Sequence, residues 1–211
     1  MLAGSREVTL KTMNNIPVKN IFAAVFTKKI LDPLLKVLDL KSVKFWGTEG
    51  TMKYVKVKGY SGKSVVGGFD FDGRVKSLDR LIFARILADR TKEKHLEELK
   101  KLALNTSEVS SDSSEVSWEP FDLVIVDLYK PDARNFPESM DIGGQALIRA
   151  AIKNYQNVAL AFDKKSIEGV ASELVKNNGS TTLPFRKNQA KSALKFIAER
   201  SKLESDLFSK L

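Results

Sequence analysis

The chain lacks several residue types on which common catalytic sites depend. It has no cysteine and one histidine, His95, among 211 residues. The absence of cysteine excludes disulfide scaffolds, thiolate zinc sites, iron–sulfur clusters and cysteine nucleophiles. A single histidine also excludes metal sites built on several histidines, and any Ser–His pair that does not use His95. Because His95 lies in the charged helical pattern TKEKHLEELKKL, we expect it to be a surface residue.

Long apolar runs and internal repeats are missing as well. No run approaches the ~18 apolar residues of a membrane span, and residues 1–20 contain no apolar signal-peptide core. We therefore expect a cytoplasmic protein without a membrane partner. We interpret residues 1–211 as a single domain, with an N-terminal extension over 1–20, an exposed Ser-rich loop over 104–120 and a C-terminal helical region over 184–211.

Basic residues outnumber acidic ones. The 35 Lys and Arg against 26 Asp and Glu give a formal net charge of +9. Such a charge suits an anionic partner, which could be nucleic acid, an acidic membrane surface or a phosphorylated metabolite, although a solvated lysine-rich surface explains it equally well. A nucleic-acid-binding α/β module therefore stays open as an alternative, even though no aromatic-rich sheet motif or recognition-helix pattern is present.

Short apolar runs alternate with helical patterns along the chain. The runs cover residues 21–26, 43–46, 121–128 and 158–162, and the helical patterns cover 31–40, 78–90, 143–154 and 166–178. Runs that are apolar on both faces are typical of strands buried on both sides of a parallel sheet. The alternation predicts a doubly wound, mostly parallel α/β sheet with helices on both faces. In such a sheet the ligand is expected at the carboxyl ends of the strands.

Four clusters contain residues suited to holding an anion or moving a proton. They are Gly47-Thr48-Glu49-Gly50-Thr51 after a strand, Arg74-Val75-Lys76-Ser77 before a helix, Asp127-Leu128-Tyr129-Lys130 at the carboxyl end of a strand, and Asp141-Ile142-Gly143-Gly144 before another helix. Glycines, hydroxyls and paired cations at helix starts favour phosphate binding. Ordinary turns and helix caps, with Ser77 and Asp141 as N-caps, use the same residues. No cluster specifies a function by itself.

Taken in this order, the clusters resemble the inosine monophosphate (IMP) cyclohydrolase domain. That domain is the N-terminal half of a bifunctional purine-biosynthesis protein whose other half is a formyltransferase. The most specific stretches are DGRVKSL, from Asp72, and DIGGQALIRAAIKN, from Asp141; FDLVIVDLY and GTEGT support them. The resemblance runs from about Ile21 to the C-terminus and implies a methylglyoxal-synthase-like, three-layer α/β/α fold. Because the formyltransferase half is missing, it implies a stand-alone cyclohydrolase.

The resemblance implies a dehydrating ring closure of 5-formamidoimidazole-4-carboxamide ribotide to IMP, the last step of purine biosynthesis. It implies a small ribotide substrate, no nucleic-acid partner, no cofactor and no metal, and it leaves a homodimer open. Lys76, Tyr129, Asp141 and Lys153 match the family positions that act on the formyl and carboxamide groups. The matching ribotide and phosphate positions are Lys28, Gly47, Thr48, Glu49, Gly50, Thr51, Arg74, Ser77, Asp127, Ile142, Gly143 and Gly144.

The sequence also departs from the family pattern. The segment after the first strand reads Ala24-Val25-Phe26-Thr27-Lys28 and lacks two hydroxyls that would serve the phosphate, and Glu49 replaces a glycine. A non-catalytic ribotide-binding protein and a methylglyoxal synthase of the same fold are therefore alternatives; the Asp-Gly-Arg-Val-Lys motif argues against the second. Asp141 and Lys153 stand about 18 Å apart along a straight helix, so they meet one substrate only if Asp141 precedes the helix.

Overall fold

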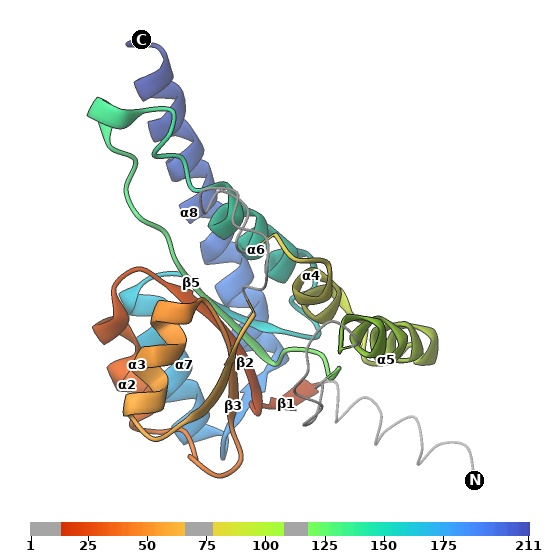
Figure 1. Cartoon of the computed structure of the whole chain (residues 1–211). Helices are drawn as coiled ribbons and strands as arrows, with labels where there is room; N and C mark the ends of the chain where they lie inside the picture. Colours follow the sequence, from red (N-terminus) through yellow and green to blue (C-terminus); the bar gives the residue numbers. More distant parts are fainter. Residues whose placement is uncertain (1–13, 66–77, 108–117) are drawn as a thin grey trace, which may run out of the picture.

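A computed structural model describes residues 14–65, 78–107 and 118–211 (Figure 1). Its central sheet has five parallel strands in the order β4-β3-β2-β5-β6. They are β2 (Asn20–Val25), β3 (Lys44–Gly47), β4 (Ser61–Ser64), β5 (Leu123–Asp127) and β6 (Ala159–Ala161). A separate antiparallel pair joins β1 (Asn15–Pro17) to β7 (Ser180–Thr182).

Helices cover both faces of the central sheet (Figure 1). The first face packs against α2 (Asp32–Leu35), α3 (Glu49–Val57) and α7 (Lys164–Lys176), and the second against α4 (Arg80–Leu87), α6 (Ile142–Lys153) and α8 (Leu183–Phe208). The remaining helices are η1 (Lys28–Leu31), α5 (Glu93–Ser107) and η2 (Ala133–Asn135). None of the helices in the described part of the chain is long and apolar enough to cross a membrane.

The apolar run of β2 shows why the sheet is buried on both sides. Ile21, Ala23 and Val25 belong to the core under α2, α3 and α7, whereas Phe22 belongs to the core under α4, α6 and α8. Successive side chains of a strand point to opposite faces, so a strand between two helical layers is apolar at every position. The prediction of a doubly wound, mostly parallel α/β sheet with helices on both faces is confirmed.

The strand order places a switch point between β2 and β5. From β2 the chain adds β3 and β4 on one side, and it then adds β5 and β6 on the other side. The connections that leave β2 and β5 therefore run in opposite directions and leave a crevice at the carboxyl ends of these strands.

Two expected helices are shorter in the structure than their patterns predict. The pattern over 31–40 forms only η1 and α2, which end at Leu35. The hydroxyl of Tyr60 bonds the carbonyls of Leu35 (2.5 Å) and Leu38 (3.0 Å), where a longer helix would place its own amides. The helix predicted over 78–90 covers Arg80–Leu87, and its N-cap is Asp79, whose carboxylate accepts from the Ile82 amide. Ser77, the N-cap predicted from sequence, lies outside the described residues.

The apolar residues of α8 predict its buried face only in part: Ala193 and Ile197 are buried, but Leu203 is not. The buried positions are Arg186, Ala190, Ala193, Ile197, Arg200 and Glu204, whereas Leu203 is 41% exposed. The C-terminal half of α8 runs beyond the sheet beside the segment that joins β5 to α6 (Figure 1). There its partners are polar: Arg200 donates to the Tyr129 carbonyl and Glu204 accepts from Gln145. Arg200 and Glu204 are buried because they form hydrogen bonds to polar groups of the neighbouring segment. Apolar side chains at these positions would leave the polar groups without partners.

Candidate active site

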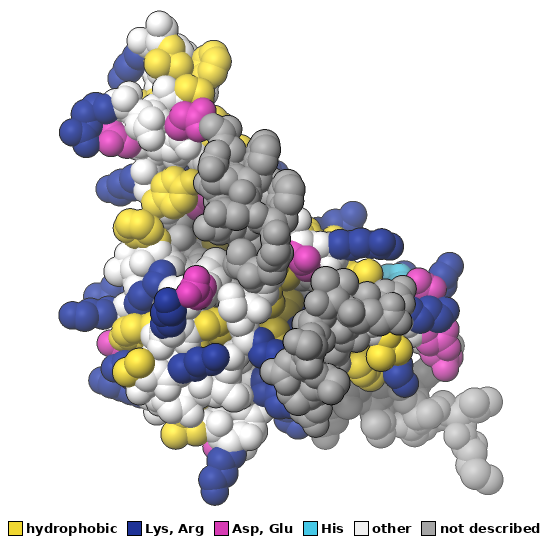
Figure 2. All heavy atoms as spheres, in the orientation of Figure 1, with side chains coloured by type: hydrophobic (Ala, Val, Ile, Leu, Met, Phe, Trp, Pro, Cys, Tyr) yellow, Lys and Arg dark blue, Asp and Glu magenta, His cyan; other side chains and the backbone are white. Residues whose placement is uncertain are grey.

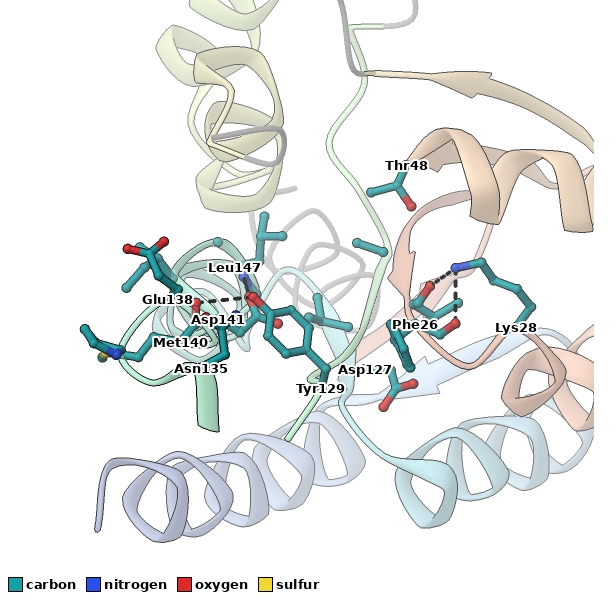
Figure 3. Close-up of a pocket in the computed structure, with 17 residues that line it drawn as sticks. Phe26, Lys28, Thr48, Asp127, Tyr129, Asn135, Glu138, Met140, Asp141 and Leu147 are labelled. Carbon is teal, nitrogen blue, oxygen red and sulfur yellow. Dashed lines mark hydrogen bonds between the residues drawn. The ribbon is translucent and has the colours of Figure 1, made fainter. Parts of the chain in front are cut away.

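A pocket of about 860 Å³ opens at the switch point, where β2, β3 and β5 end (Figure 3). Its wall combines the end of β2, the residue after β3, the end of β5 and the start of α6. The lining residues are Ala24, Val25, Phe26, Lys28, Thr48, Val126, Asp127, Tyr129, Asn135, Pro137, Glu138, Met140, Asp141, Ile142, Gly143, Gly144 and Leu147. The ligand site therefore lies where the fold class predicts it.

One end of the pocket carries a carboxylate and a phenol. Asp141 is the N-cap of α6, and its Oδ1 accepts from the Gly144 amide at 2.7 Å. The Tyr129 hydroxyl donates to the Met140 carbonyl at 3.2 Å, which holds the phenol ring beside Asp141 (Figure 3). We refer to Tyr129 and Asp141 together as the acid–base end.

Burial sets the protonation of both groups at the acid–base end. Burial raises the pKa of the Asp141 carboxyl, while the Gly144 amide and the charge of Arg200 lower it and Asp127 raises it. Burial and the charge of Asp141 also raise the pKa of Tyr129, which therefore stays a hydrogen-bond donor. A carboxylate whose pKa is raised is a stronger base, so Asp141 is suited to accept a proton.

The opposite end of the pocket carries a cation and the hydroxyl of Thr48, which is hydrogen bonded to the buried Thr51 behind it. The Lys28 ammonium donates to the Val25 and Phe26 carbonyls, and burial lowers its pKa, an effect that Asp127 opposes. The hydroxyls of Thr48 and Thr51 are hydrogen bonded 2.9 Å apart at the start of α3. The amides of a helix start, a hydroxyl and an ammonium together favour an anion such as phosphate. We refer to Lys28 and Thr48 as the anion end; Thr51, predicted from sequence as a phosphate contact, is buried and does not line the pocket.

Two predicted residues of the GTEGT loop, Glu49 and Gly50, lie near the anion end but do not line the pocket. Gly50 lies against Lys28, because a Cβ at this position would stand 3.4 Å from Lys28 Cε. Glu49, which would oppose an anion, forms an ion pair with Lys53 at 2.8 Å, and its side chain is 72% exposed. The loop can therefore accept an anion despite its acidic residue.

Gly47 has a structural task that differs from the close ligand approach expected from its sequence. It faces Ala23 in the parallel pairing of β2 and β3, and a Cβ at Gly47 would lie 1.8 Å from the Ala23 carbonyl oxygen. The glycine is needed because the backbone of the neighbouring strand occupies the place of a side chain.

The structure brings together a large part of the predicted site. The predicted residues that line the pocket are Lys28, Thr48, Asp127, Tyr129, Asp141, Ile142, Gly143 and Gly144. Arg74, Lys76 and Ser77 lie outside the described residues. In the described part of the chain, no group of three His, Cys, Asp or Glu residues is placed to hold a metal ion.

Lys153 does not join the other predicted residues within one chain. Asp141 caps the start of α6, whereas Lys153 is the last residue of this helix and is exposed. The two residues are therefore separated by the whole helix, about 18 Å. From the sequence, we expect the two residues to meet one substrate only if Asp141 precedes the helix. Asp141 does precede it, yet Lys153 is not among the residues that line the pocket.

Sequence analysis did not select Arg200, which supports the acid–base end from α8. Arg200 is 9% exposed and donates from Nη1 to the Tyr129 carbonyl at 2.9 Å. Its spacing from Ala193 and Ile197 is the signal that predicts burial, because positions three and seven residues apart share one helix face. The pocket residues Phe26, Asn135, Glu138 and Met140 were also not selected. Phe26 directly follows β2, Asn135 is the last residue of η2, and Glu138 and Met140 lie between η2 and α6.

Replacing Arg200 by Met is expected to change the acid–base end in two measurable ways. Loss of the cation removes one of the groups that lower the pKa of Asp141, so this pKa rises further. The Tyr129 carbonyl also loses its donor, which costs about 1–3 kcal/mol of folding free energy. Carboxyl-detected NMR titration and urea unfolding measure the two effects. Arg200→Lys keeps the charge and serves as the control; an unchanged Asp141 titration in Arg200→Met would contradict the assignment.

The amino-acid sequence of the chain is similar to that of known bacterial proteins. No family model matches it. Over 182 residues, 81% of its length, it is 33% identical to the bifunctional purine biosynthesis protein PurH of Clostridium botulinum (strain Kyoto / Type A2). The chain is homologous to a segment of PurH. The match takes in 34% of the clostridial PurH. PurH of Clostridium perfringens (strain SM101 / Type A) is 34% identical over 172 residues, which are 76% of this chain and 32% of that PurH.

A solved structure shares the fold. The structure titled "Crystal structure of ForH" aligns with a TM-score of 0.68 at 23% identity, covering 90% of this chain and 99% of that chain. The similarity supports the methylglyoxal-synthase-like α/β fold expected from the sequence. The ForH chain therefore supports the α/β architecture of this protein.

Proposed function

We propose that the chain is an IMP cyclohydrolase that acts in purine biosynthesis. The reaction closes the ring of 5-formamidoimidazole-4-carboxamide ribotide and releases water. The observation that carries the proposal is one crevice with an anion end and an acid–base end, in a chain homologous to a segment of PurH. A ribotide has matching ends, a phosphate and a reacting carboxamide with its neighbouring formamide.

The pocket residues support each part of the reaction. The carboxamide nitrogen attacks the formyl carbon, and the Asp141 carboxylate takes the proton of the nitrogen. The Tyr129 phenol, whose own proton bonds the Met140 carbonyl, accepts a hydrogen bond from the amide and so orients it. Ile142 and Gly143 line the pocket at the start of α6, where the helix dipole favours negative charge on the tetrahedral oxygen. This oxygen leaves as water with two protons, one from the carboxamide nitrogen through Asp141 and one from the formamide nitrogen, whose loss completes the new ring C=N bond. Both reacting groups belong to one molecule, so positioning supplies much of the rate.

The remaining predicted residues keep their proposed roles. Arg74 and Ser77 would contact the phosphate side, and Lys76 would stabilise the oxyanion or donate the proton to the leaving water. For Lys153, contact with the substrate requires a second copy of the chain, because its own helix holds it away from the pocket. We therefore include a homodimer in the proposal.

Figure 2 bears on the alternative of a nucleic-acid-binding module. On the face shown, Lys and Arg side chains are spread over several elements and are interspersed with Asp and Glu. A backbone-tracking groove would instead favour a continuous basic stripe. This observation favours a small anionic substrate over nucleic acid on the drawn face.

The test is the conversion of the formamido ribotide by the purified chain. We expect IMP to form, measured by absorbance and confirmed by chromatography of the product. The control is the same reaction with heat-inactivated protein, since slow uncatalysed closure would otherwise be counted. IMP binding without turnover would replace the proposed activity by a non-catalytic ribotide-binding function. Turnover of dihydroxyacetone phosphate instead would favour a methylglyoxal synthase.

Lys28→Met is expected to weaken ribotide binding because it removes the cation of the anion end. Loss of one charged hydrogen-bond partner of the phosphate raises KM about 10- to 100-fold, with a smaller change in kcat. Lys29→Met is the matched control, since it removes the same charge from an exposed neighbour that does not line the pocket. Equal effects of the two variants in steady-state kinetics would show that only the net charge matters.

A further inference from the structure

Phe26 stands out among the pocket residues because its apolar ring is open to solvent. It is 71% exposed although it lines the pocket. It directly follows β2, whose own apolar residues are buried in the two cores. An exposed aromatic ring at the wall of a polar pocket offers a face to a ligand rather than to the protein core.

The backbone around Phe26 is held on both sides. The Thr27 amide donates to Asp127 Oδ2 at 2.9 Å, which joins this segment to the end of β5. The Lys28 ammonium donates to the Phe26 carbonyl at 3.3 Å. These bonds hold the backbone that carries the ring at the wall of the pocket, so the segment needs little ordering when a ligand binds.

The ring of Phe26 is paired with that of Tyr129. Their centroids are 6.3 Å apart and the planes are inclined at 57°. Phe26 lies between Tyr129 of the acid–base end and Lys28 of the anion end (Figure 3). A molecule that spans the two ends therefore passes the Phe26 ring with its middle part.

We propose that Phe26 is a specificity-determining residue that stacks on a planar heteroaromatic ring of the ligand, between the anion end and the acid–base end. The inference rests on the proposed function for the orientation of the ligand, with its phosphate at Lys28. It adds a selection rule: the pocket prefers phosphorylated ribosides that carry a flat ring to pentose phosphates without one. Stacking on an aromatic side chain tolerates any ring with a π-face.

The test compares two ligands with the wild type, Phe26→Leu and Phe26→Trp in isothermal titration calorimetry. IMP carries the ring and ribose 5-phosphate lacks it. We expect Phe26→Leu to weaken IMP binding about tenfold, because leucine offers similar volume without a π-face. Phe26→Trp restores IMP binding to within about twofold, and ribose 5-phosphate binds all three proteins alike.

Two results would overturn the inference. One is an unchanged IMP affinity in Phe26→Leu; the other is an equal loss for IMP and ribose 5-phosphate, which would show that Phe26 supports the fold of the segment instead of the ring. The outcome is separable from that of the proposed function. Ring-dependent binding through Phe26 without IMP synthesis would refute the cyclohydrolase alone, whereas IMP synthesis with an unchanged KM in Phe26→Leu would refute the stacking alone.

Discussion

Asp141→Asn is expected to lower kcat for ring closure by about 10²- to 10⁴-fold, the contribution of a positioned general base. The amide keeps the shape of the side chain but has no charge with which to take the carboxamide proton. An Asn at this position can still accept from the Gly144 amide, which Asp141 does at 2.7 Å. Steady-state kinetics with the formamido ribotide measure the loss, and KM is expected to change much less than kcat.

The same variant is expected to be at least as stable as the wild type near neutral pH. Burial raises the pKa of Asp141 in the folded protein, so the folded state holds this proton to a higher pH than the unfolded chain does. The free energy of unfolding therefore falls as the pH rises from the ordinary carboxyl pKa through the raised one. Asp141→Asn lacks this dependence, which urea unfolding over that pH interval measures.

The wild-type pH profile gives an independent check on Asp141. We expect kcat/KM to rise with pH as the carboxyl ionises, with a midpoint above the ordinary carboxyl pKa because burial raises it. A variant Asp141→Asn with wild-type turnover, or one that unfolds under conditions where the wild type is folded, would refute the assigned role.

Gly47→Ala is expected to destabilise the fold by about 3 kcal/mol, at the upper end of typical overpacking effects. The added Cβ would lie 1.8 Å from the Ala23 carbonyl oxygen and 3.1 Å from Met52 Cε. The nearest obstacle is backbone, which cannot rotate away as a side chain does. The strands β2 and β3 must therefore separate at the edge of the pocket, and ligand binding falls together with stability.

Gly169→Ala is the matched control for this prediction. Gly169 lies within α7, and a Cβ there meets only Gln189 and Phe185 side-chain atoms at 3.8 and 4.0 Å. Since alanine is a better helix former, this variant is expected to gain about 1 kcal/mol. Urea unfolding of the two variants gives the comparison; a Gly47→Ala protein with wild-type stability would show that the β2–β3 pairing tolerates a methyl group.

The site residues that could be predicted from the sequence are those next to the ends of strands and the starts of helices. The clusters that follow β3 and β5, and the one that precedes α6, were recognisable because strand ends and helix starts have clear patterns. Thr48, Asp127 and Asp141 therefore line the pocket as expected. Phe26 was missed because an aromatic residue after an apolar run continues the pattern of a buried strand, and only the fold shows that it is exposed.

Arg200 and Lys153 show that separation along the chain does not predict distance in space. Arg200 is 71 positions from Tyr129, whose carbonyl it binds, so the contact depends on where α8 passes the segment after β5. Lys153 is twelve positions from Asp141, yet a helix between them separates the two side chains by about 18 Å. Proximity along the chain therefore indicates neither contact nor separation unless the element between the residues is known.

The sequence by itself determined the layered α/β class, because residues apolar at every position of a strand can be accommodated only between two helical layers. It also determined which chemical groups stand at the strand ends. The tertiary structure decided the rest: the reversal of strand order between β2 and β5 opens the crevice, the passage of α8 brings Arg200 to Tyr129, and the backbone of β2 makes Gly47 structural. These outcomes depend on contacts between distant segments, which no local pattern of residues encodes.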